Sequence, residues 1–263
     1  MIEKNLIEQQ REHFDSIADK YFSARQNKNH LQFKKLIWKE FFKDFTWEKE
    51  RTLVLEPMCG YSEGERILSE NIDTKLIYEG FDYSQPLINE VLKKDPKKNV
   101  YKQDVTKFKP TKKYDIIIII GGLHHVYRNT DTVLESINKA LNKNGYFIVL
   151  EPTQNNPLFR FVRSKIYSKN NIFDSETEKA YDLDTLNKHF ELNNFEIVKQ
   201  IYPGLLGYIL YYNPDAFPIL NKGSIKLVNI IFTLEKFCYS NFVGKYFSFA
   251  TMSLLRKKHK IYF

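Results

Sequence analysis

Cysteine is scarce in this sequence: only Cys59 and Cys238 occur among 263 residues, and they lie far apart. A disulfide framework or a cysteine-rich metal site needs more cysteines at shorter spacing, so neither is expected. A low cysteine content is compatible with a reducing compartment, and we predict a cytoplasmic location.

Long apolar runs are also scarce. The run from Ile116 to Ile120 is among the longest, and it falls well short of the ~20 residues that a membrane-spanning helix needs. The first residues, 1–13, carry charged side chains and lack the apolar centre of a signal peptide. We therefore expect neither a membrane span nor export.

Charge, by contrast, is unbalanced, with a formal net charge of +8. An excess of positive charge raises the question of an anionic partner, such as nucleic acid, a membrane surface or a phosphorylated substrate. The basic residues form short separate groups, which favours an ordinary solvated surface. A high content of Lys, Asn, Ile and Phe is also typical of an AT-rich bacterial genome, so the charge alone identifies no partner.

Apolar residues make up 43% of the chain and aromatic residues 15%, enough for one well-filled core. Residues 5–47 are expected to be helical, because Phe33, Ile37, Phe41 and Phe45 recur at every fourth position. In the following part, short apolar strands alternate with helical stretches. This alternation is typical of a parallel sheet that is covered on both faces.

The alternation predicts five strands up to Pro152. Ser62 and Glu65 have the spacing of a capping box, so a helix is expected to begin at Ser62. A later helix is expected to include Leu141 and to be closed by Asn144 and Gly145. The predicted strands are 52–55, 76–81, 100–101, 114–120 and 146–150.

Beyond Pro152 the pattern becomes less regular. We expect one or two inserted helices in 153–180, and a loop in 203–221 whose tyrosines either line a binding site or pack in the core. An edge strand at 246–255 is expected to close the sheet. The aromatic residues between 232 and 249 precede a basic tail and would suit a membrane surface, but we expect them to be buried. The other predicted elements are helices at 184–190 and 224–240 and a strand at 195–202.

Three acids end three successive strands: Glu56, Asp82 and Asp104. Ligands of open parallel sheets bind outside the carboxyl ends of the strands. A carboxylate after the first strand suits an amine-bearing ligand, and Asp82 stands where a carboxylate binds both hydroxyls of a ribose. Because the first loop contains no lysine, the set fits an adenosyl ligand that carries an amino acid. The alternative for each acid is a helix N-cap or a solvated strand end.

With these residues the chain resembles the Rossmann-like S-adenosylmethionine-dependent methyltransferases, close to members that methylate quinones and other small molecules. The resemblance is best over residues 10–152. The first loop of this family reads acid-x-Gly-x-Gly-x-Gly. Glu56 matches the acid and Gly60 the central glycine, whereas Met58 and Ser62 replace the two outer glycines.

The resemblance implies S-adenosylmethionine as the cofactor and assigns roles to particular residues. Asp82 would hold the ribose hydroxyls, and Asp104 with the backbone of Val105 would bind the adenine edge. Residues 14–18 and Tyr21 would cover the cofactor. The full expected cofactor-binding set is Tyr21, Glu56, Met58, Gly60, Ser62, Asp82, Tyr83, Asp104, Val105 and Gly121.

The predicted fold class is therefore α/β, a Rossmann-like doubly wound sheet, mostly parallel, with an antiparallel C-terminal edge strand. One domain is expected to fill residues 1–263. Within it, 1–47 would form an N-terminal helical cover, 48–152 the cofactor-binding core, and 153–263 the insertions and closing strands on the acceptor side.

A dinucleotide-dependent dehydrogenase is the competing interpretation, since such folds also place an acid after the second strand. The first loop argues against it. Its three-glycine fingerprint is interrupted twice, and Glu63 and Glu65 would lie beside a pyrophosphate at a helix N-terminus, where negative charge is unfavourable.

Two adjacent histidines, His124 and His125, follow Gly121 and Gly122 after the fourth strand. In the family this loop lies beside the transferred methyl group. A hydroxyl acceptor benefits from a general base near neutrality, and histidine suits that task. We predict His124 or His125 as this base, with a preference for His124; the alternative is packing. Their spacing is not that of metal ligands, and no metal is expected.

The favoured function is methylation of a small acceptor, by preference at oxygen rather than nitrogen or carbon. A phosphorylated or sugar-type acceptor in surface-glycan tailoring is one hypothesis, and Arg160, Arg163 and Lys165 would bind its anionic group. The alternatives are quinone or lipid methylation at a membrane surface and RNA methylation. RNA is disfavoured, because no Asn/Asp-Pro-Pro-Tyr/Phe loop follows the fourth strand. A regulator that only binds the cofactor is the non-enzymatic alternative.

Overall fold

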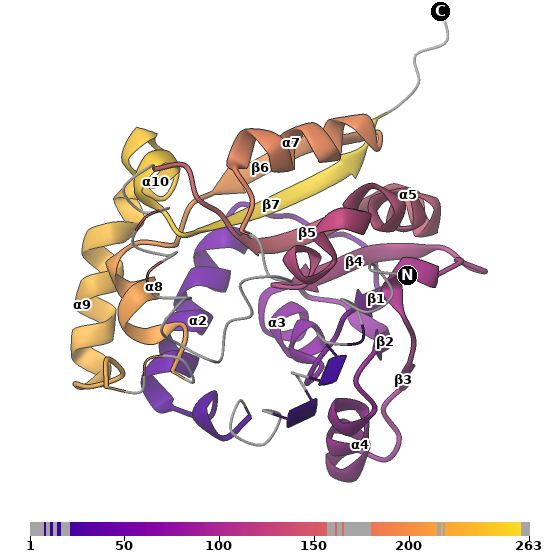
Figure 1. Cartoon of the computed structure of the whole chain (residues 1–263), viewed down its shortest axis with the longest axis horizontal. Helices are drawn as coiled ribbons and strands as arrows, with labels where there is room; N and C mark the ends of the chain where they lie inside the picture. Colours follow the sequence, from indigo (N-terminus) through magenta and orange to yellow (C-terminus); the bar gives the residue numbers. More distant parts are fainter. Residues whose placement is uncertain are drawn as a thin grey trace, which may run out of the picture.

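The computed structural model describes residues 8, 11–12, 15–16, 22–156, 161, 165, 180–214, 217 and 219–258. Their strands form one seven-stranded sheet in the order β3-β2-β1-β4-β5-β7-β6 (Figure 1). The strands are β1 Arg51–Pro57, β2 Lys75–Asp82, β3 Val100–Lys102, β4 Tyr114–Ile120, β5 Leu141–Pro152, β6 Phe195–Ile201 and β7 Ala250–Lys257.

Helices cover both faces of this sheet. In Figure 1, α5 and α7 lie above it, whereas α2 and α3 lie below it. The α-helices are α2 Lys28–Phe42, α3 Glu63–Asn71, α4 Gln85–Lys94, α5 Thr130–Ala140, α7 Leu183–Leu192, α8 Leu206–Tyr211, α9 Ile225–Glu235 and α10 Phe242–Phe247. The 3-10 helices are η1 Val105–Lys107, η2 Leu123–Asn129 and η3 Lys236–Cys238.

Two hydrophobic clusters, one on each face, explain this arrangement. Val54, Ile116 and Ile148 belong to the cluster under α2, α3, α8 and α9, whereas Leu55 and Ile117 belong to the cluster under α5 and α7. Neighbouring residues of one strand thus enter different clusters, because side chains alternate across a strand. Central strands that are apolar on both faces are the expected result of a doubly covered sheet.

The predicted fold class is confirmed, with one change at the C-terminal strand. β7 is antiparallel to both of its neighbours, as expected, but it lies between β5 and β6. The outermost strand on that side is β6. Residues 250–255 of β7 are all buried, and a strand that is buried on both faces gains more from an inner position than from an edge.

The boundary between α5 and β5 also differs from the prediction. Leu141 does not extend the helix: α5 ends at Ala140, and Leu141 pairs with Tyr114 of β4. Asn144 and Gly145 therefore lie within β5 rather than closing the helix. A Cβ on Gly145 would come within 2.7 Å of the carbonyl oxygen of Asp115, so this glycine permits a close approach between two strands.

Two further expectations are settled in the C-terminal half. The 203–221 segment contains the short helix α8, and Tyr208, Tyr211 and Tyr212 are buried there, which supports the packing interpretation. The aromatic residues of 232–249 divide instead into two groups. Phe232 and Tyr239 are buried as expected, but Phe237, Phe242, Tyr246 and Phe247 are exposed. Among the described residues, no helix is both long and apolar enough to cross a bilayer.

Candidate functional site

The candidate site lies at the carboxyl ends of β1 and β4. The strand order reverses between these two neighbouring strands, and such a switch point is where open α/β sheets bind ligands. The loops that follow them touch each other: a Cβ on Gly122 would lie 3.0 Å from the sulfur of Met58. Gly121 has a φ of +64°, a conformation that glycine adopts without strain.

The first loop keeps a glycine-type backbone even where glycine is missing. Met58, Gly60 and Ser62 all have positive φ, at 56°, 50° and 59°. These are the three positions at which the acid-x-Gly-x-Gly-x-Gly pattern has glycine. Two of these three left-handed conformations thus fall on residues with side chains, for which this backbone geometry is strained.

Glu56, the last acid of β1, points under the start of α3. Its carboxylate accepts hydrogen bonds from the backbone N–H of Gly64 at 2.9 Å and from the hydroxyl of Tyr78 at 2.6 Å. Burial raises the pKa of Glu56 to about 8, and these two donors oppose the shift. A Cβ on Gly64 would lie 2.7 Å from the carboxyl carbon, so glycine at this position makes room for the carboxylate.

This arrangement replaces the capping box that the sequence predicted at Ser62. α3 does begin after Ser62, but the Ser62 side chain makes no capping hydrogen bond. Glu63, at the first position of α3, forms an ion pair with Lys34 of α2. Burial alone would raise the pKa of Glu63, but the buried ammonium of Lys34 lowers it to about 2. The sequence did not indicate this pair, because nothing in the spacing of the two residues relates them.

Asp82 ends β2 and faces the first loop. Its carboxylate accepts the backbone N–H of Gly60 at 2.9 Å and that of Ser84 at 2.9 Å, one on each oxygen. Burial raises its pKa, while both backbone donors lower it. Each carboxylate oxygen can accept a second hydrogen bond, so this side chain is held in place and retains capacity for two hydroxyl donors.

The N-terminal segment reaches the same region. Tyr83 donates its hydroxyl proton to Glu8, and the Ser84 hydroxyl donates to Asp15. Arg11 bridges these two acids, at 2.8 Å from Glu8 and 2.7 Å from Asp15. Tyr21 and residues 14, 17 and 18 of the expected cover lie outside the described residues.

Asp104 follows β3 and caps the short helix η1. One carboxylate oxygen accepts the backbone N–H of Thr106 at 2.9 Å and its hydroxyl at 2.7 Å. The other lies 3.0 Å from the ammonium of Lys107. Val105 is buried beside it. The side chain thus has the N-cap geometry that we had considered as the alternative to a ligand contact.

The two histidines lie at the start of η2, after β4. The Nδ1 of His124 lies 2.8 Å from a carboxylate oxygen of Glu151, the acid that ends β5. The same carboxylate accepts the backbone N–H groups of Gly122, Leu123 and His124 at 2.9, 2.8 and 3.2 Å. His125 lies against His124, with 3.8 Å between the ring centroids.

When Glu151 is ionised, its carboxylate would accept the three backbone N–H groups and would hold a proton on Nδ1 of His124. Nε2 is then the basic nitrogen of the ring. Burial raises the pKa of Glu151 to about 8, and the three backbone N–H groups oppose that shift. The pair thus has the geometry of a general base with its orienting carboxylate.

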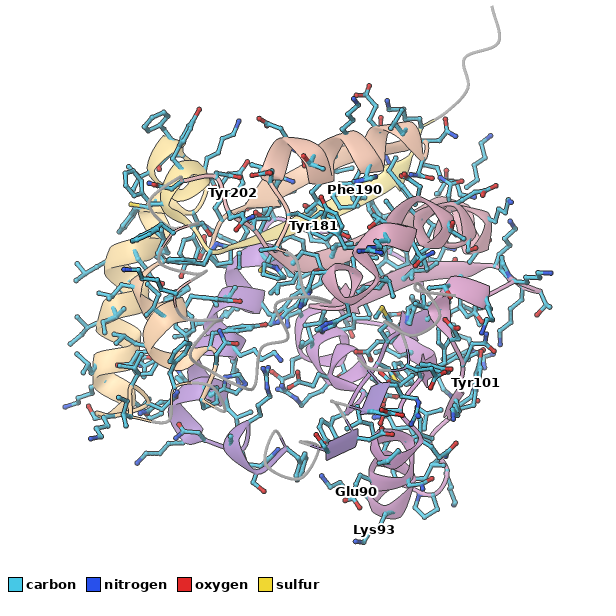
Figure 2. The ribbon with its side chains drawn as sticks, viewed as in Figure 1. Glu90, Lys93, Tyr101, Tyr181, Phe190 and Tyr202 are labelled. Atoms are coloured by element: carbon cyan, nitrogen blue, oxygen red, sulfur yellow. The ribbon has the colours of Figure 1, made fainter. Side chains whose placement is uncertain are left out.

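Tyr181 supports this loop from behind. Its hydroxyl donates to the carbonyl oxygen of Leu123 at 3.1 Å and lies 2.6 Å from the hydroxyl of Thr130. In Figure 2, Tyr181 lies in the interior, below α7. The loop that carries His124 is therefore anchored from β5 by Glu151 and from the α7 side by Tyr181.

Sequence reasoning missed Glu151, although a signal was present. The tetrapeptide Val-Leu-Glu-Pro occurs twice, at Val54–Pro57 and at Val149–Pro152. In both places it ends a parallel strand of the central sheet. The acid of the first copy was recognised as a candidate, and the same reasoning applied to the second would have included Glu151.

Comparison with known proteins gives one family match. The family described as "methyltransferase domain" matches residues 36–200, from α2 to β6. A search of curated proteins finds no match to this sequence.

Solved structures share the fold at low sequence identity. An S-adenosylmethionine-dependent methyltransferase from Clostridium acetobutylicum is 12% identical, with a TM-score of 0.57 and coverage of 94% of this chain and 98% of that one. An O-methyltransferase from Brevibacillus brevis, in complex with S-adenosyl-L-homocysteine, is 16% identical, with a TM-score of 0.54 and coverage of 85% and 72%. A Geobacter sulfurreducens methyltransferase with the same ligand is 16% identical, with a TM-score of 0.54 and coverage of 86% and 91%.

Proposed function

The chain belongs to the methyltransferase-domain family, and from this premise we propose that it transfers the methyl group of S-adenosylmethionine to a hydroxyl group of a small acceptor. The observation that carries the proposal is the His124–Glu151 pair, which presents a basic imidazole nitrogen beside the switch point of the sheet. Two of the structural neighbours hold S-adenosyl-L-homocysteine, the product that remains after S-adenosylmethionine has lost its methyl group.

The residues of the first two loops fit this cofactor. The carboxylate of Asp82 is fixed by two backbone N–H groups and has accepting capacity for the two hydroxyls of a ribose. Glu56 places a buried carboxyl group beneath the loop 58–62, where an ammonium group of the cofactor would favour its ionised form. Asp104 and Val105 would border the adenine, and Tyr83 would lie beside the ribose.

When bound, S-adenosylmethionine supplies a methyl group on a positively charged sulfur. In the transfer a C–O bond would form as the C–S bond broke, and the electron pair of the C–S bond would stay on sulfur. His124 would accept the hydroxyl proton of the acceptor at Nε2, and ionised Glu151 would stabilise the imidazolium that results. The closely packed loops at Met58 and Gly122 would hold the reactants in line.

The hydroxyl acceptor follows from the base, because an alcohol or phenol must lose a proton and a neutral amine can attack without help. The sequence predicts that Arg160, Arg163 and Lys165 bind an anionic group of the acceptor. Arg160 and Arg163 lie outside the described residues, and the ammonium of Lys165 lies 4.4 Å from the ring centroid of Phe161. We therefore define the acceptor by its hydroxyl group.

Two variants separate cofactor binding from transfer. Asp82→Ala is expected to weaken S-adenosylmethionine binding about 100-fold in calorimetry, since charge-assisted hydrogen bonds are lost. Asp95→Ala is the matched control, because Asp95 also accepts a backbone N–H but lies at the far end of α4. His124→Ala is expected to leave this affinity unchanged and to lower methyl transfer by about 10²–10³-fold.

Transfer would be measured with methyl-labelled S-adenosylmethionine on sugar phosphates, phenols and quinols, with RNA as a separate substrate. Wild-type cofactor affinity in Asp82→Ala would contradict the binding site. Labelling of RNA would contradict the small acceptor, and labelling of amines alone would contradict the hydroxyl acceptor. An unchanged rate of methyl transfer in His124→Ala would contradict the role of His124 as the general base.

A further inference from the structure

The surface of α9, η3 and α10 exposes several large apolar side chains. Leu227, Ile230, Leu234 and Phe237 follow one another at helical spacing along α9 and η3, and all are exposed. Leu234 and Phe237 are 71% and 73% exposed. Phe242 and Tyr246 of α10 add to them. We call the surface formed by Leu227, Ile230, Leu234, Phe237, Phe242 and Tyr246 the α9–α10 face.

The outward side of α9 is not the side that packs in the core. Val228 and Phe232 are buried on its opposite side, against α2 and α8. A helix at the surface of a protein normally turns polar residues outward. In Figure 1, α9 and α10 lie together at the left margin of the molecule. A contiguous apolar surface of this kind marks an interaction site.

The exposed charges of the segment 217–249 are of one sign. The segment 217–249 contains four lysines, Lys222, Lys226, Lys236 and Lys245, and a single acid, Glu235. Glu235 is buried, where it accepts the backbone N–H of Gly207 at 2.8 Å and the hydroxyl of Tyr239 at 2.6 Å. The lysines are exposed or half-buried, so the charge that this segment presents to a partner is positive.

We propose that the α9–α10 face binds the surface of a membrane that contains anionic lipids. Helices that lie flat on a bilayer place their apolar side chains about 5–10 Å into the boundary between headgroups and acyl chains, while lysines contact the headgroups. Lys236, whose ammonium lies 5.6 Å from the ring centroid of Phe237, joins both features at one point. A second copy of the chain is a poorer occupant, because two positively charged faces repel each other.

The binding surface is independent of the methyl-transfer reaction proposed above, and its test needs neither cofactor nor acceptor. The full chain would be sedimented with vesicles of phosphatidylcholine alone and with vesicles that also contain phosphatidylglycerol. We expect the chain to bind the anionic vesicles, because each lysine near an anionic surface raises the partition coefficient about fivefold. Added salt should weaken this binding, because it screens the attraction between the lysines and the headgroups.

Substitutions locate the contact. Leu234→Ser with Phe237→Ser is expected to lower the partition coefficient by more than about tenfold, because each buried apolar side chain contributes about that factor. Leu192→Ser is the matched control: Leu192 is 64% exposed, but it lies at the end of α7. Lys226→Gln is expected to weaken binding to anionic vesicles by about fivefold. All four side chains are exposed, so thermal unfolding should change little.

Several results would overturn the proposal. The chain could fail to bind anionic vesicles, or it could bind both vesicle types equally. Leu192→Ser could also lower the partition coefficient as much as the double variant does. A dimer in sedimentation velocity that the double variant abolishes would assign the face to a second copy instead.

Discussion

The strands β1 and β5 end in the same four residues, Val-Leu-Glu-Pro, yet their glutamates have different surroundings. Both side chains are almost fully buried, at 2% exposure for Glu56 and 0% for Glu151, and burial raises the pKa of each to about 8. Glu56 binds a helix N-terminus and a tyrosine hydroxyl. Glu151 binds three backbone N–H groups and an imidazole.

The difference arises from the face of the sheet to which each glutamate points. Val54 belongs to the cluster under α2 and α3, but Val149 belongs to the cluster under α5 and α7. Two residues further along a strand, a side chain lies on the same face again. Glu56 therefore meets the start of α3 and Glu151 meets η2. The contacts of an acid at a strand end thus depend on the face of the sheet to which it points and on the loop that it meets there. The local sequence, which is the same for Glu56 and Glu151, does not determine them.

The largest contrast is expected in the rate of methyl transfer. In Glu151→Gln the new amide would donate to Nδ1 of His124, which moves the ring proton to Nε2 and removes the base. We expect kcat to fall by about 10²–10⁴-fold with cofactor affinity unchanged. Glu56→Gln is expected to lower the affinity for S-adenosylmethionine by about tenfold and to change kcat little.

The pH dependence of the methyl-transfer rate tests whether Glu151 orients His124 or only stabilises the fold. The wild-type rate should rise as pH passes through about 8, because a protonated Glu151 no longer accepts the Nδ1 proton. Glu151→Gln should lose this rise, and Glu56→Gln should keep it. Equal losses of rate in both variants, or a retained rise in Glu151→Gln, would break the comparison.

A smaller effect is expected on stability. A glutamate with a pKa raised from 4.5 to about 8 binds more protons folded than unfolded between these values. Its contribution to the free energy of unfolding is complete below about pH 4.5 and is lost progressively up to about pH 8. Glutamine does not titrate. Glu56→Gln should therefore gain stability relative to the wild type as pH rises, by roughly 3–5 kcal/mol at about pH 8.

Urea denaturation at about pH 5 and about pH 8 measures this difference. In Glu56→Gln the amide side chain would still accept from Gly64 and could donate to Tyr78, so the loop should remain intact. Glu151→Gln should show the same trend with a smaller gain, because its amide would face the backbone N–H of His124. A difference that shrinks with rising pH would contradict the raised pKa values.

The smallest test concerns the loop after Glu56. Ser62 has a φ of 59° and makes no capping hydrogen bond, so the strain of its left-handed backbone is not offset by a cap. Ser62→Gly should raise the free energy of unfolding by about 0.5–1 kcal/mol. Ser69→Gly, within the regular part of α3, should lower it by a similar amount. A loss of stability in Ser62→Gly would indicate that its hydroxyl is required.

Much of the cofactor side of the site could be predicted because its signals are local in sequence. Glu56, Asp82 and Asp104 each follow a short apolar strand, and the structure places each at a strand end or cap. The resemblance also located positions 58, 60 and 62, and all three residues have positive φ in the structure. The capping partner of α3 was predicted wrongly, since Ser62 and Glu65 satisfied the spacing whereas a residue from β1 makes the contact.

The transfer side depended on pairs that are distant in sequence. Glu151 lies 27 residues from His124, and Lys34 lies 29 residues from Glu63. β7 likewise takes its place between β5 and β6 only once the two later strands pair. Such contacts form across strands or between a helix and a loop, and no spacing rule reports them.

The alternation of apolar strands and helices determined by itself that this chain forms a doubly covered, mostly parallel sheet, and the acids at the strand ends predicted a ligand site at its carboxyl edge. Tertiary structure alone decided which carboxyl group meets a helix and which meets a histidine. It also decided that the apolar face of α9 remains outside the core. The physical reason is that periodicity fixes how a segment folds, whereas the direction of each side chain in space depends on which layer packs against it.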